Sequence, residues 1–252
     1  MAKKIEKQVR TNDILLGFLE RPALKWLAKH MPAWVNPDIL TITGLVGTAI
    51  TVLGYALVGE GEVRNNNFLW LASLGFVINW FGDSLDGTLA RYRHIERPRF
   101  GYFIDHSVDA ITSSAIFLAL GLSGMVPFGM GAMAAIGYLL AMINVYLNTY
   151  VTGVFEMTSM KLGPTEIRVI AILANALVFF FGNPEFSLPI VGTVNTFTVI
   201  LGVIIAILYI YFIYKTIADG RRLALLDGKR LERRLEREAK KEAKSQMKGK
   251  KG

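Results

Sequence analysis

Cysteine is absent from this chain of 252 residues, and histidine occurs only three times, at His30, His94 and His106. Without cysteine, neither a disulfide framework nor a thiolate metal site can form. The histidines lack the spacing of zinc ligands, and the sequence contains no P-loop and no dinucleotide-binding fingerprint. These absences exclude thiol chemistry and the common motif-bearing nucleotide folds, so any chemistry must come from other residue types.

Long hydrophobic segments dominate the sequence instead. Hydrophobic residues make up 52% of the chain, more than an ordinary soluble domain contains. A membrane-spanning helix needs about 20 mainly apolar residues. Six segments satisfy this requirement: 38–59, 68–90, 101–124, 128–153, 164–182 and 191–217. The sequence therefore predicts an all-α integral membrane protein built as a bundle of six transmembrane helices.

Lysine and arginine are distributed unevenly between the connections. Seven precede the first segment, four lie in the loop after the second, and fourteen follow from Lys215 onward, whereas the three alternate loops share one, Arg64. Cytoplasmic loops of membrane proteins carry an excess of Lys and Arg. Both termini and the loops after the second and fourth segments are therefore predicted to be cytoplasmic. The first segment lies too far from Met1 for a signal peptide, so we expect it to be the first transmembrane helix.

Two regions are expected outside the membrane, at 1–36 and 221–252, around a transmembrane domain at 37–220. Residues 11–34 mix Leu, Phe and Trp with basic residues, which suits an interfacial helix anchored by Trp26 and Trp34. The alternative is a solvated helix packed on the bundle. The tail carries thirteen basic and five acidic residues. Because the tail follows a membrane span, its charge suits contact with anionic lipid better than nucleic-acid binding. A solvated helix that only secures the topology is the favoured interpretation of the three.

Four aspartates interrupt two of these segments, in the pairs Asp83 with Asp86 and Asp105 with Asp109. Charged residues are costly inside a bilayer and are usually functional there. At about 100° per residue, positions 83, 86, 87, 90 and 91 share one helix face within roughly 140°, and the second pair shares another face. Because the two helices run antiparallel across a short loop, a rise of about 1.5 Å per residue places all four carboxylates at one depth near the cytoplasmic side.

Four carboxylates at one depth repel one another unless they are protonated, paired or bridged by cations. A site with only oxygen ligands favours a hard divalent ion such as Mg²⁺, Mn²⁺ or Ca²⁺. One or two such ions suit phosphate chemistry, because they neutralise a pyrophosphate and stabilise its leaving group. On the same helix face, Gly87 and Ala90 allow a bulky ligand to approach the backbone, and Arg91 can clamp a phosphate.

Eight residues of this pattern fall within 27 positions: Asp83-x2-Asp86-Gly87-x2-Ala90-Arg91, then Gly101-x3-Asp105-x3-Asp109. The pattern resembles the signature of the CDP-alcohol phosphotransferase family, with nine residues rather than the commonest eight between Arg91 and Gly101. The resemblance implies six transmembrane helices, a cytoplasm-facing site and, as a family property, a homodimer. It also implies transfer of a substituted phosphate from a CDP-linked donor to an alcohol hydroxyl, with release of CMP in phospholipid synthesis.

The resemblance assigns a role to each residue of the pattern. The expected ligands of one or two Mg²⁺ or Mn²⁺ ions are Asp83, Asp86, Asp105 and Asp109. The residues expected to bind the CDP group are Gly87, Ala90 and Arg91. Asp109 is also expected to act as the catalytic general base, since a carboxylate within reach of the attacking hydroxyl can take its proton.

Two further stretches resemble parts of the family. The run from Asn36 to Thr41 looks like the start of its first helix, a candidate wall of the nucleotide site, although a simple turn and helix start account for it equally well. The Asp105-His106 dipeptide and the stretch from Gly163 to Glu166 are similar to enzymes that use CDP-choline or CDP-ethanolamine. Without the resemblance, His106 is a packing residue and Glu166 an ordinary acid of a first helical turn.

Lys161 and Arg168 also lie on the predicted cytoplasmic side. They could receive an anionic acceptor, but the positive-inside rule accounts for them slightly better. The acceptor alcohol itself stays open. Either CDP carries diacylglycerol and a soluble alcohol attacks, or CDP carries a small head group and a lipid hydroxyl attacks.

A cation or proton transporter is the main alternative, because intramembrane carboxylates also mark ion paths. A transporter predicts polar residues that continue toward the far side of the membrane. Polarity beyond Asp109 ends within one further turn, after Thr112, Ser113 and Ser114. A non-catalytic scaffold with a structural metal would leave Arg91 and the small residues beside the aspartates unexplained. A metal-dependent phosphotransferase is therefore favoured over both.

Overall fold

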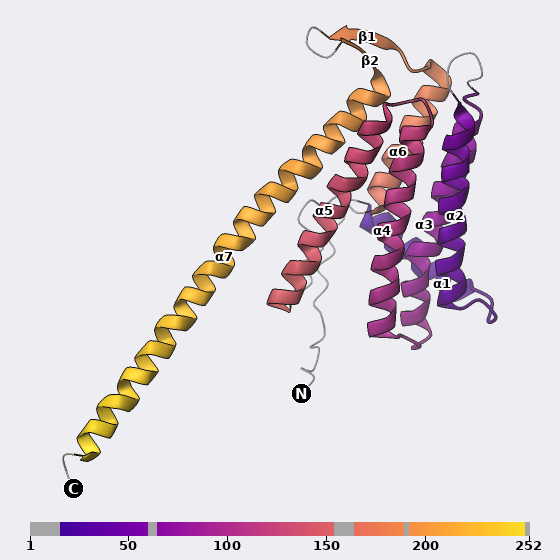
Figure 1. Cartoon of the computed structure of the whole chain (residues 1–252). Coiled ribbons are helices and arrows are strands. Elements are labelled where there is room, and N and C mark those ends of the chain that lie inside the picture. The colour runs from indigo at the N-terminus through magenta and orange to yellow at the C-terminus, as the bar shows by residue number, and fades with distance from the viewer. Residues whose placement is uncertain (1–15, 60–64, 154–163, 189–191, 250–252) are drawn as a thin grey trace. The chain divides into compact units, whose positions relative to one another are not determined.

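The computed structural model describes residues 16–59, 65–153, 164–188 and 192–249, and Figure 1 shows its elements in chain order. The elements are α1 (Gly17–His30), α2 (Pro37–Val58), α3 (Phe68–Tyr92), α4 (Pro98–Leu122), α5 (Phe128–Thr152), α6 (Pro164–Phe181), β1 (Glu185–Leu188), β2 (Gly192–Asn195) and α7 (Thr196–Gly249). Six helices, α2 to α7, are long and apolar enough to cross a membrane. The chain is a multi-pass integral membrane protein, and the predicted all-α class is confirmed.

The chain divides into two compact units, Met1–Tyr209 and Ile210–Gly252. The first holds α1 to α6, the β1–β2 hairpin and the beginning of α7, and the second holds the remainder of α7. Within the second unit, ion pairs one helical turn apart join Lys215 to Asp219 and Arg234 to Glu238. Such pairs add a few tenths of a kcal/mol each. The expected boundary between transmembrane domain and tail at residue 221 stays a prediction.

Helices α2 and α3 touch backbone to backbone along a glycine seam formed by Gly47, Gly54, Gly75 and Gly82. A Cβ built on Gly47 would lie 2.3 Å from the backbone nitrogen of Asn79, and one on Gly54 would lie 2.4 Å from that of Ala72. Only hydrogen fits at such positions, and small residues are what allow membrane helices to approach this closely. The seam fixes α3, which carries the first aspartate pair, against α2.

A buried polar chain joins three helices inside the apolar core. The Tyr55 hydroxyl of α2 donates to Asn175 Oδ1 of α6 at 3.1 Å, and Asn175 Nδ2 donates to Ser73 Oγ of α3 at 3.2 Å. Apolar side chains from α2 to α7 surround this chain, among them Phe76, Met125 and Leu201. Because buried polar groups are costly unless they are hydrogen-bonded, these contacts hold α6 in a defined position beside α2 and α3.

Helix α1 packs on the bundle by one face and exposes apolar side chains on the other. Leu24 and Ala28 are buried in one cluster with Leu85 and Leu89 of α3, whereas Phe18, Leu19 and Trp26 are exposed. The packing on the bundle that the alternative interpretation of 11–34 required is therefore present. The interfacial interpretation stays a prediction, which the exposed apolar side chains suit. Residues 11–15 lie outside the described residues.

The sixth apolar segment begins later than predicted. Residues 192–195 form β2, which pairs antiparallel with β1 in the register Glu185 to Asn195, so the predicted start at 191 is wrong. Thr193 and Val194 suit a strand as well as a span, which explains the error. Helix α7 begins only at Thr196, where the Asn195 side chain accepts a hydrogen bond from the Thr198 backbone N–H at 2.8 Å.

Candidate functional site

Both aspartate pairs lie at one end of the first unit, where α3 ends and α4 begins; we name it the aspartate end. Asp83 and Asp86 lie in the second half of α3, and Asp105 and Asp109 lie in the first half of α4. Asp109 interacts electrostatically with the other three carboxylates and with the Arg168 guanidinium. The structure thus brings together the four carboxylates singled out in the sequence, while their roles as ligands and base stay predictions.

The start of α2 forms one wall of this cluster. The Thr41 hydroxyl lies 2.6 Å from Asp86 Oδ2, to which it donates, and the backbone N–H of Gly87 donates to the other carboxylate oxygen. Asn36 caps α2 by accepting from the Ile39 backbone N–H at 2.9 Å. The ordinary helix start expected from Asn36 is therefore present, and Thr41, four residues into α2, contacts an aspartate of the cluster.

Arg168 enters the cluster from α6. Its Nη2 lies 2.6 Å from Asp83 Oδ2, and the residue is only 8% exposed. From sequence, Arg168 was better explained by the positive-inside rule than by the site, and its pairing with Asp83 was missed. A signal was present, since Arg168 is the one basic residue in the apolar stretch 164–181 and a cation within a span is costly. Lys161 lies outside the described residues.

The three residues expected to bind CDP lie on the last turns of α3. Arg91 is exposed, and its Nη2 lies 3.2 Å from the Thr88 hydroxyl oxygen. A Cβ built on Gly87 would lie 3.2 Å from Arg91 Nη1, so the absence of a side chain at Gly87 leaves room for this guanidinium. Ala90 is half-buried on the same turn. Arg91 thus lies at the margin of the cluster, beside a bare stretch of backbone.

His106 packs among aromatic rings. It is buried, its ring centroid lies 4.2 Å from that of Tyr102 and 5.1 Å from that of Tyr146, and its Nδ1 lies 3.7 Å from Asp105 Oδ2. This environment agrees with the packing interpretation made from sequence. Tyr138 and Tyr146 of α5 lie within electrostatic range of Asp109. Tyrosine side chains of α5 therefore lie beside the cluster. Sequence reasoning did not identify this contribution of α5.

The α3–α4 loop clamps the linker between α1 and α2. The Arg93 guanidinium donates to the backbone carbonyls of Met31 and Pro32 at 2.9 Å and to that of Val35. Arg97 pairs with Asp38 in the first turn of α2. Since Thr41 follows one turn after Asp38, these contacts fix the wall that faces Asp86.

Two buried glutamates tie α1 to α3 and α6. Glu20 of α1 accepts from Trp80 Nε1 at 2.9 Å and from the Thr165 hydroxyl at 2.8 Å. Glu166 is 4% exposed, and its Oε1 accepts from the Leu16 backbone N–H at 2.9 Å. Glu166 therefore does more than favour a helix start, as the sequence had suggested: it anchors the segment that leads into α1.

The donor set of the cluster fits a hard divalent cation, since the four predicted ligands are carboxylates. Among the described residues, however, no three His, Cys, Asp or Glu side chains lie so that they could hold a metal ion together. Asp83 is paired with Arg168 and Asp86 with Thr41. Cation binding would therefore require Asp83 to change partner, whereas the Asp86 carboxylate offers further lone pairs to a cation while Thr41 fixes its orientation.

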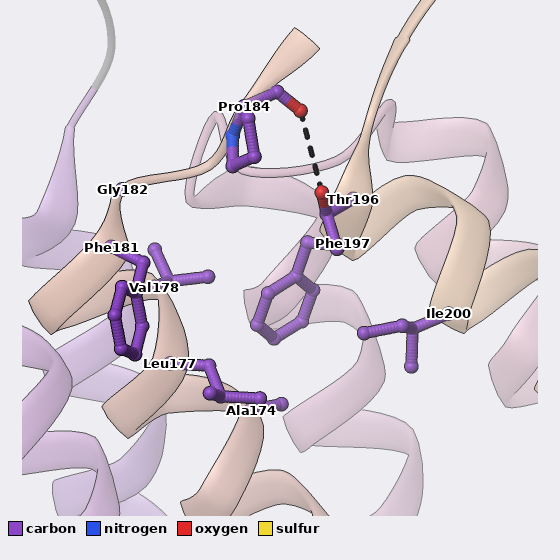
Figure 2. A pocket seen from close by; sticks show the side chains of 9 residues that line it. All are labelled: Ala174, Leu177, Val178, Phe181, Gly182, Pro184, Thr196, Phe197 and Ile200. Atoms are coloured by element: carbon purple, nitrogen blue, oxygen red, sulfur yellow. Dashed lines mark hydrogen bonds between the residues drawn. The ribbon is translucent and has the colours of Figure 1, made fainter. Parts of the chain in front are cut away.

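A cavity of about 190 Å³ lies elsewhere, between α6, the segment that joins α6 to β1, and the start of α7. Figure 2 shows its lining, which includes Leu177, Phe181, Phe197 and Ile200, and the hydrogen bond from the Thr196 hydroxyl to the Pro184 carbonyl oxygen at 3.4 Å. The lining is apolar and comes from the C-terminal end of α6, whereas Arg168 lies near its N-terminal end. This cavity is therefore separate from the aspartate end and brings no charged group to a ligand.

Comparison with known proteins gives a consistent result. The family model for CDP-alcohol phosphatidyltransferase matches residues 34–208. Over 201 residues, the chain is 30% identical to cholinephosphotransferase 1 of Danio rerio, covering 75% of this chain and 50% of that protein. It is 27% identical over 179 residues to the CDP-diacylglycerol–serine O-phosphatidyltransferase of Encephalitozoon cuniculi, covering 69% and 46%.

A third relative is the choline/ethanolaminephosphotransferase 1 of Saccharomyces cerevisiae, 24% identical over 188 residues, with 72% of this chain and 46% of that protein covered. The chain thus spans about half the length of these curated relatives. The matched range of the family model runs from Trp34 to Leu208 and so includes all four aspartates, Thr41, Arg91, His106 and Arg168.

Proposed function

Because the chain belongs to the CDP-alcohol phosphatidyltransferase family, we propose that it transfers a substituted phosphate from a CDP-linked donor to an alcohol hydroxyl and releases CMP, a step of phospholipid synthesis. The observation that carries the proposal is the cluster of four carboxylates from α3 and α4, held between Thr41 of α2 and Arg168 of α6. Family membership favours this reaction over a cation or proton transporter.

In the proposed step, the acceptor oxygen attacks the phosphorus that carries the substituent of the donor. A new P–O bond forms to the acceptor, and the P–O bond to the cytidine monophosphate breaks, so CMP leaves with the bridging oxygen. The acceptor proton passes to the Asp109 carboxylate. Asp109 suits this role because it interacts with all the other charged groups of the cluster, and a carboxylate close to the attacking hydroxyl can serve as general base.

The four aspartates Asp83, Asp86, Asp105 and Asp109 would hold one or two Mg²⁺ or Mn²⁺ ions. Bound divalent ions would neutralise the diphosphate and stabilise the leaving CMP. Gly87, Ala90 and Arg91 would bind the CDP group, with the bare backbone at Gly87 admitting the ligand and Arg91 donating to phosphate. His106, packed among aromatic rings, would stay beside Asp105, from whose Oδ2 its Nδ1 lies 3.7 Å away.

The proposal places both termini and the aspartate end on the cytoplasmic side, because Lys and Arg concentrate in the connections at that end. Lipid bilayer, CDP-linked donor and alcohol acceptor are the proposed partners, and a homodimer is the proposed assembly. The names of the relatives contain choline, ethanolamine and serine. The proposal therefore includes both donor arrangements: CDP-diacylglycerol with a soluble alcohol, and a CDP-amino alcohol with a lipid hydroxyl.

Purified protein in lipid nanodiscs should release CMP when a correct donor and acceptor are supplied with Mg²⁺ or Mn²⁺. The screen pairs CDP-diacylglycerol with serine, glycerol phosphates and inositol, and pairs CDP-choline and CDP-ethanolamine with diacylglycerol. Mass spectrometry of the lipid formed identifies the acceptor. Turnover that persists after chelation by EDTA would contradict the metal-dependent mechanism, and protein that binds CDP yet transfers to no acceptor would contradict the reaction.

A further inference from the structure

Arg168 is a buried guanidinium with only part of its donor capacity used. Its Nη2 pairs with Asp83 Oδ2 at 2.6 Å, but its buried Nη1 makes no hydrogen bond among the described residues. A guanidinium presents five N–H donors in a planar fork that matches carboxylate or phosphate oxygens. Leaving a buried charged donor unmatched is unfavourable, so the position of Arg168 calls for an anionic partner beyond Asp83.

The contacts around Arg168 hold it in place at the cluster. It interacts electrostatically with Asp109 as well as Asp83, and Tyr138 of α5 lies within electrostatic range of all three. One turn or less before it on α6, Thr165 and Glu166 are tied to α1 by their hydrogen bonds to Glu20 and to the segment at residue 16. The start of α6 is thereby anchored, and the guanidinium is directed at the carboxylates.

We propose that Arg168 is a substrate-binding residue that exchanges partners: it neutralises Asp83 in the free protein and donates to a phosphate oxygen of the CDP-linked donor when donor and cation enter. This inference rests on the proposed function, which supplies the diphosphate ligand. It assigns to α6 a direct contact with substrate that the α3–α4 pattern alone does not contain.

Charge balance is the reason for the exchange. A cation that binds Asp83 competes with the guanidinium for the same carboxylate, because the two positive charges repel at short range. The entering diphosphate then offers the displaced guanidinium a charge-assisted and potentially bidentate partner. Cation and nucleotide should therefore bind with positive coupling, and by linkage each should raise the affinity for the other to the same extent.

The test measures binding rather than turnover. Titration calorimetry of full-length protein in nanodiscs gives the affinity for Mn²⁺ alone, for CDP alone and for each in the presence of the other. In the wild-type protein, Mn²⁺ should tighten CDP binding. In Arg168→Gln, Mn²⁺ alone should bind at least as tightly as in the wild type, while CDP affinity with Mn²⁺ should fall on the order of 10-fold to 100-fold. The coupling between Mn²⁺ and CDP should weaken, because only the direct attraction between the ion and the diphosphate then remains.

Two variants control for folding and for general charge. Arg168→Lys keeps the positive charge for Asp83 but lacks the planar fork, so it should fold like the wild type and lose part of the CDP affinity. Arg99→Gln removes an exposed cation at the start of α4, at the same end of the bundle, and should leave both affinities unchanged. Thermal unfolding of each variant verifies that the compared proteins are folded.

Unchanged CDP affinity and coupling in folded Arg168→Gln or Arg168→Lys protein would overturn the inference while leaving the proposed function intact. Unchanged CDP affinity combined with a raised KM for an anionic acceptor would also overturn it, because the guanidinium would then serve the acceptor. If the Arg168 variants lose CDP affinity and coupling as predicted but the wild-type protein transfers to no acceptor, the exchange at Arg168 stands and the proposed reaction fails.

Discussion

At the scale of single residues, the most specific prediction concerns the role of Asp109 as general base. Asp109→Asn removes the proposed base but keeps the size and polarity of the side chain, so turnover should fall by about 100-fold or more while binding of the CDP-linked donor is retained. CMP release and CDP calorimetry on the same preparation measure the two effects. Asp83→Asn is the comparison, since it should weaken Mn²⁺ binding as well; wild-type kcat in Asp109→Asn would show that the base lies elsewhere.

Thr41 provides a second test at this scale. Thr41→Val deletes the hydroxyl that donates to Asp86 at 2.6 Å, so this carboxylate loses its fixed orientation and the Mn²⁺ concentration for half-maximal CMP release should rise several-fold. Thr43→Val is the matched control, because among the described residues the Thr43 hydroxyl donates at 2.8 Å to the Ile39 carbonyl of its own helix and to no aspartate. An equal effect of both substitutions would mean that α2 stability, and not Asp86, is responsible.

Sequence reasoning found the carboxylates but not their partners. The aspartates could be predicted because charge within an apolar segment is conspicuous and because helical spacing places each pair on one face. Thr41, Glu20 and Arg168 reach the cluster or its supports from helices far away in the chain, and single-helix periodicity carries no information on such contacts. Arg168 was further obscured by a competing explanation, the topology rule, which predicts a cation at the same position.

At the scale of secondary-structure elements, the glycine seam should be the least tolerant part of the fold. Gly47→Ala places a Cβ 2.3 Å from the Asn79 backbone nitrogen, which forces α2 and α3 apart at a cost of about 1–3 kcal/mol or more. The protein should unfold at lower temperature and lose CMP release together. Gly129→Ala is the control, because nothing lies within 4 Å of its Cβ position and alanine favours the helix. If both variants unfolded at the same temperature, close packing at the glycine seam would not be what stabilises the fold.

The elements themselves could largely be predicted, because five of the six apolar segments coincide with helices to within a few residues. The β1–β2 hairpin could not. Val194 and Thr193 continue the apolar character of the following helix, and only the pairing with Phe186 and Ser187 distinguishes a strand there. The docking of α1 was also undecided in sequence, because one amphipathic pattern serves both a bundle and a membrane surface.

At the scale of the whole molecule, the first unit contains every residue of the aspartate end. Deletion of residues 221–252 should therefore leave CMP release per folded molecule within about twofold of the full-length value, since the tail is expected only to support topology and lipid contact. Activity in nanodiscs with and without anionic lipid separates these two roles. A folded truncated protein without activity would show that the tail belongs to the catalytic domain.

The length of α6 has a consequence for the bilayer itself. Its 18 residues span about 27 Å, less than the hydrocarbon core of about 30 Å, whereas α3, α4 and α5 have 25 residues each. Hydrophobic mismatch therefore falls mainly on α6. A thicker membrane would draw the polar start of α6, with Glu166 and Arg168, toward the acyl chains. Bilayer thickness would therefore change the surroundings of the guanidinium that pairs with Asp83.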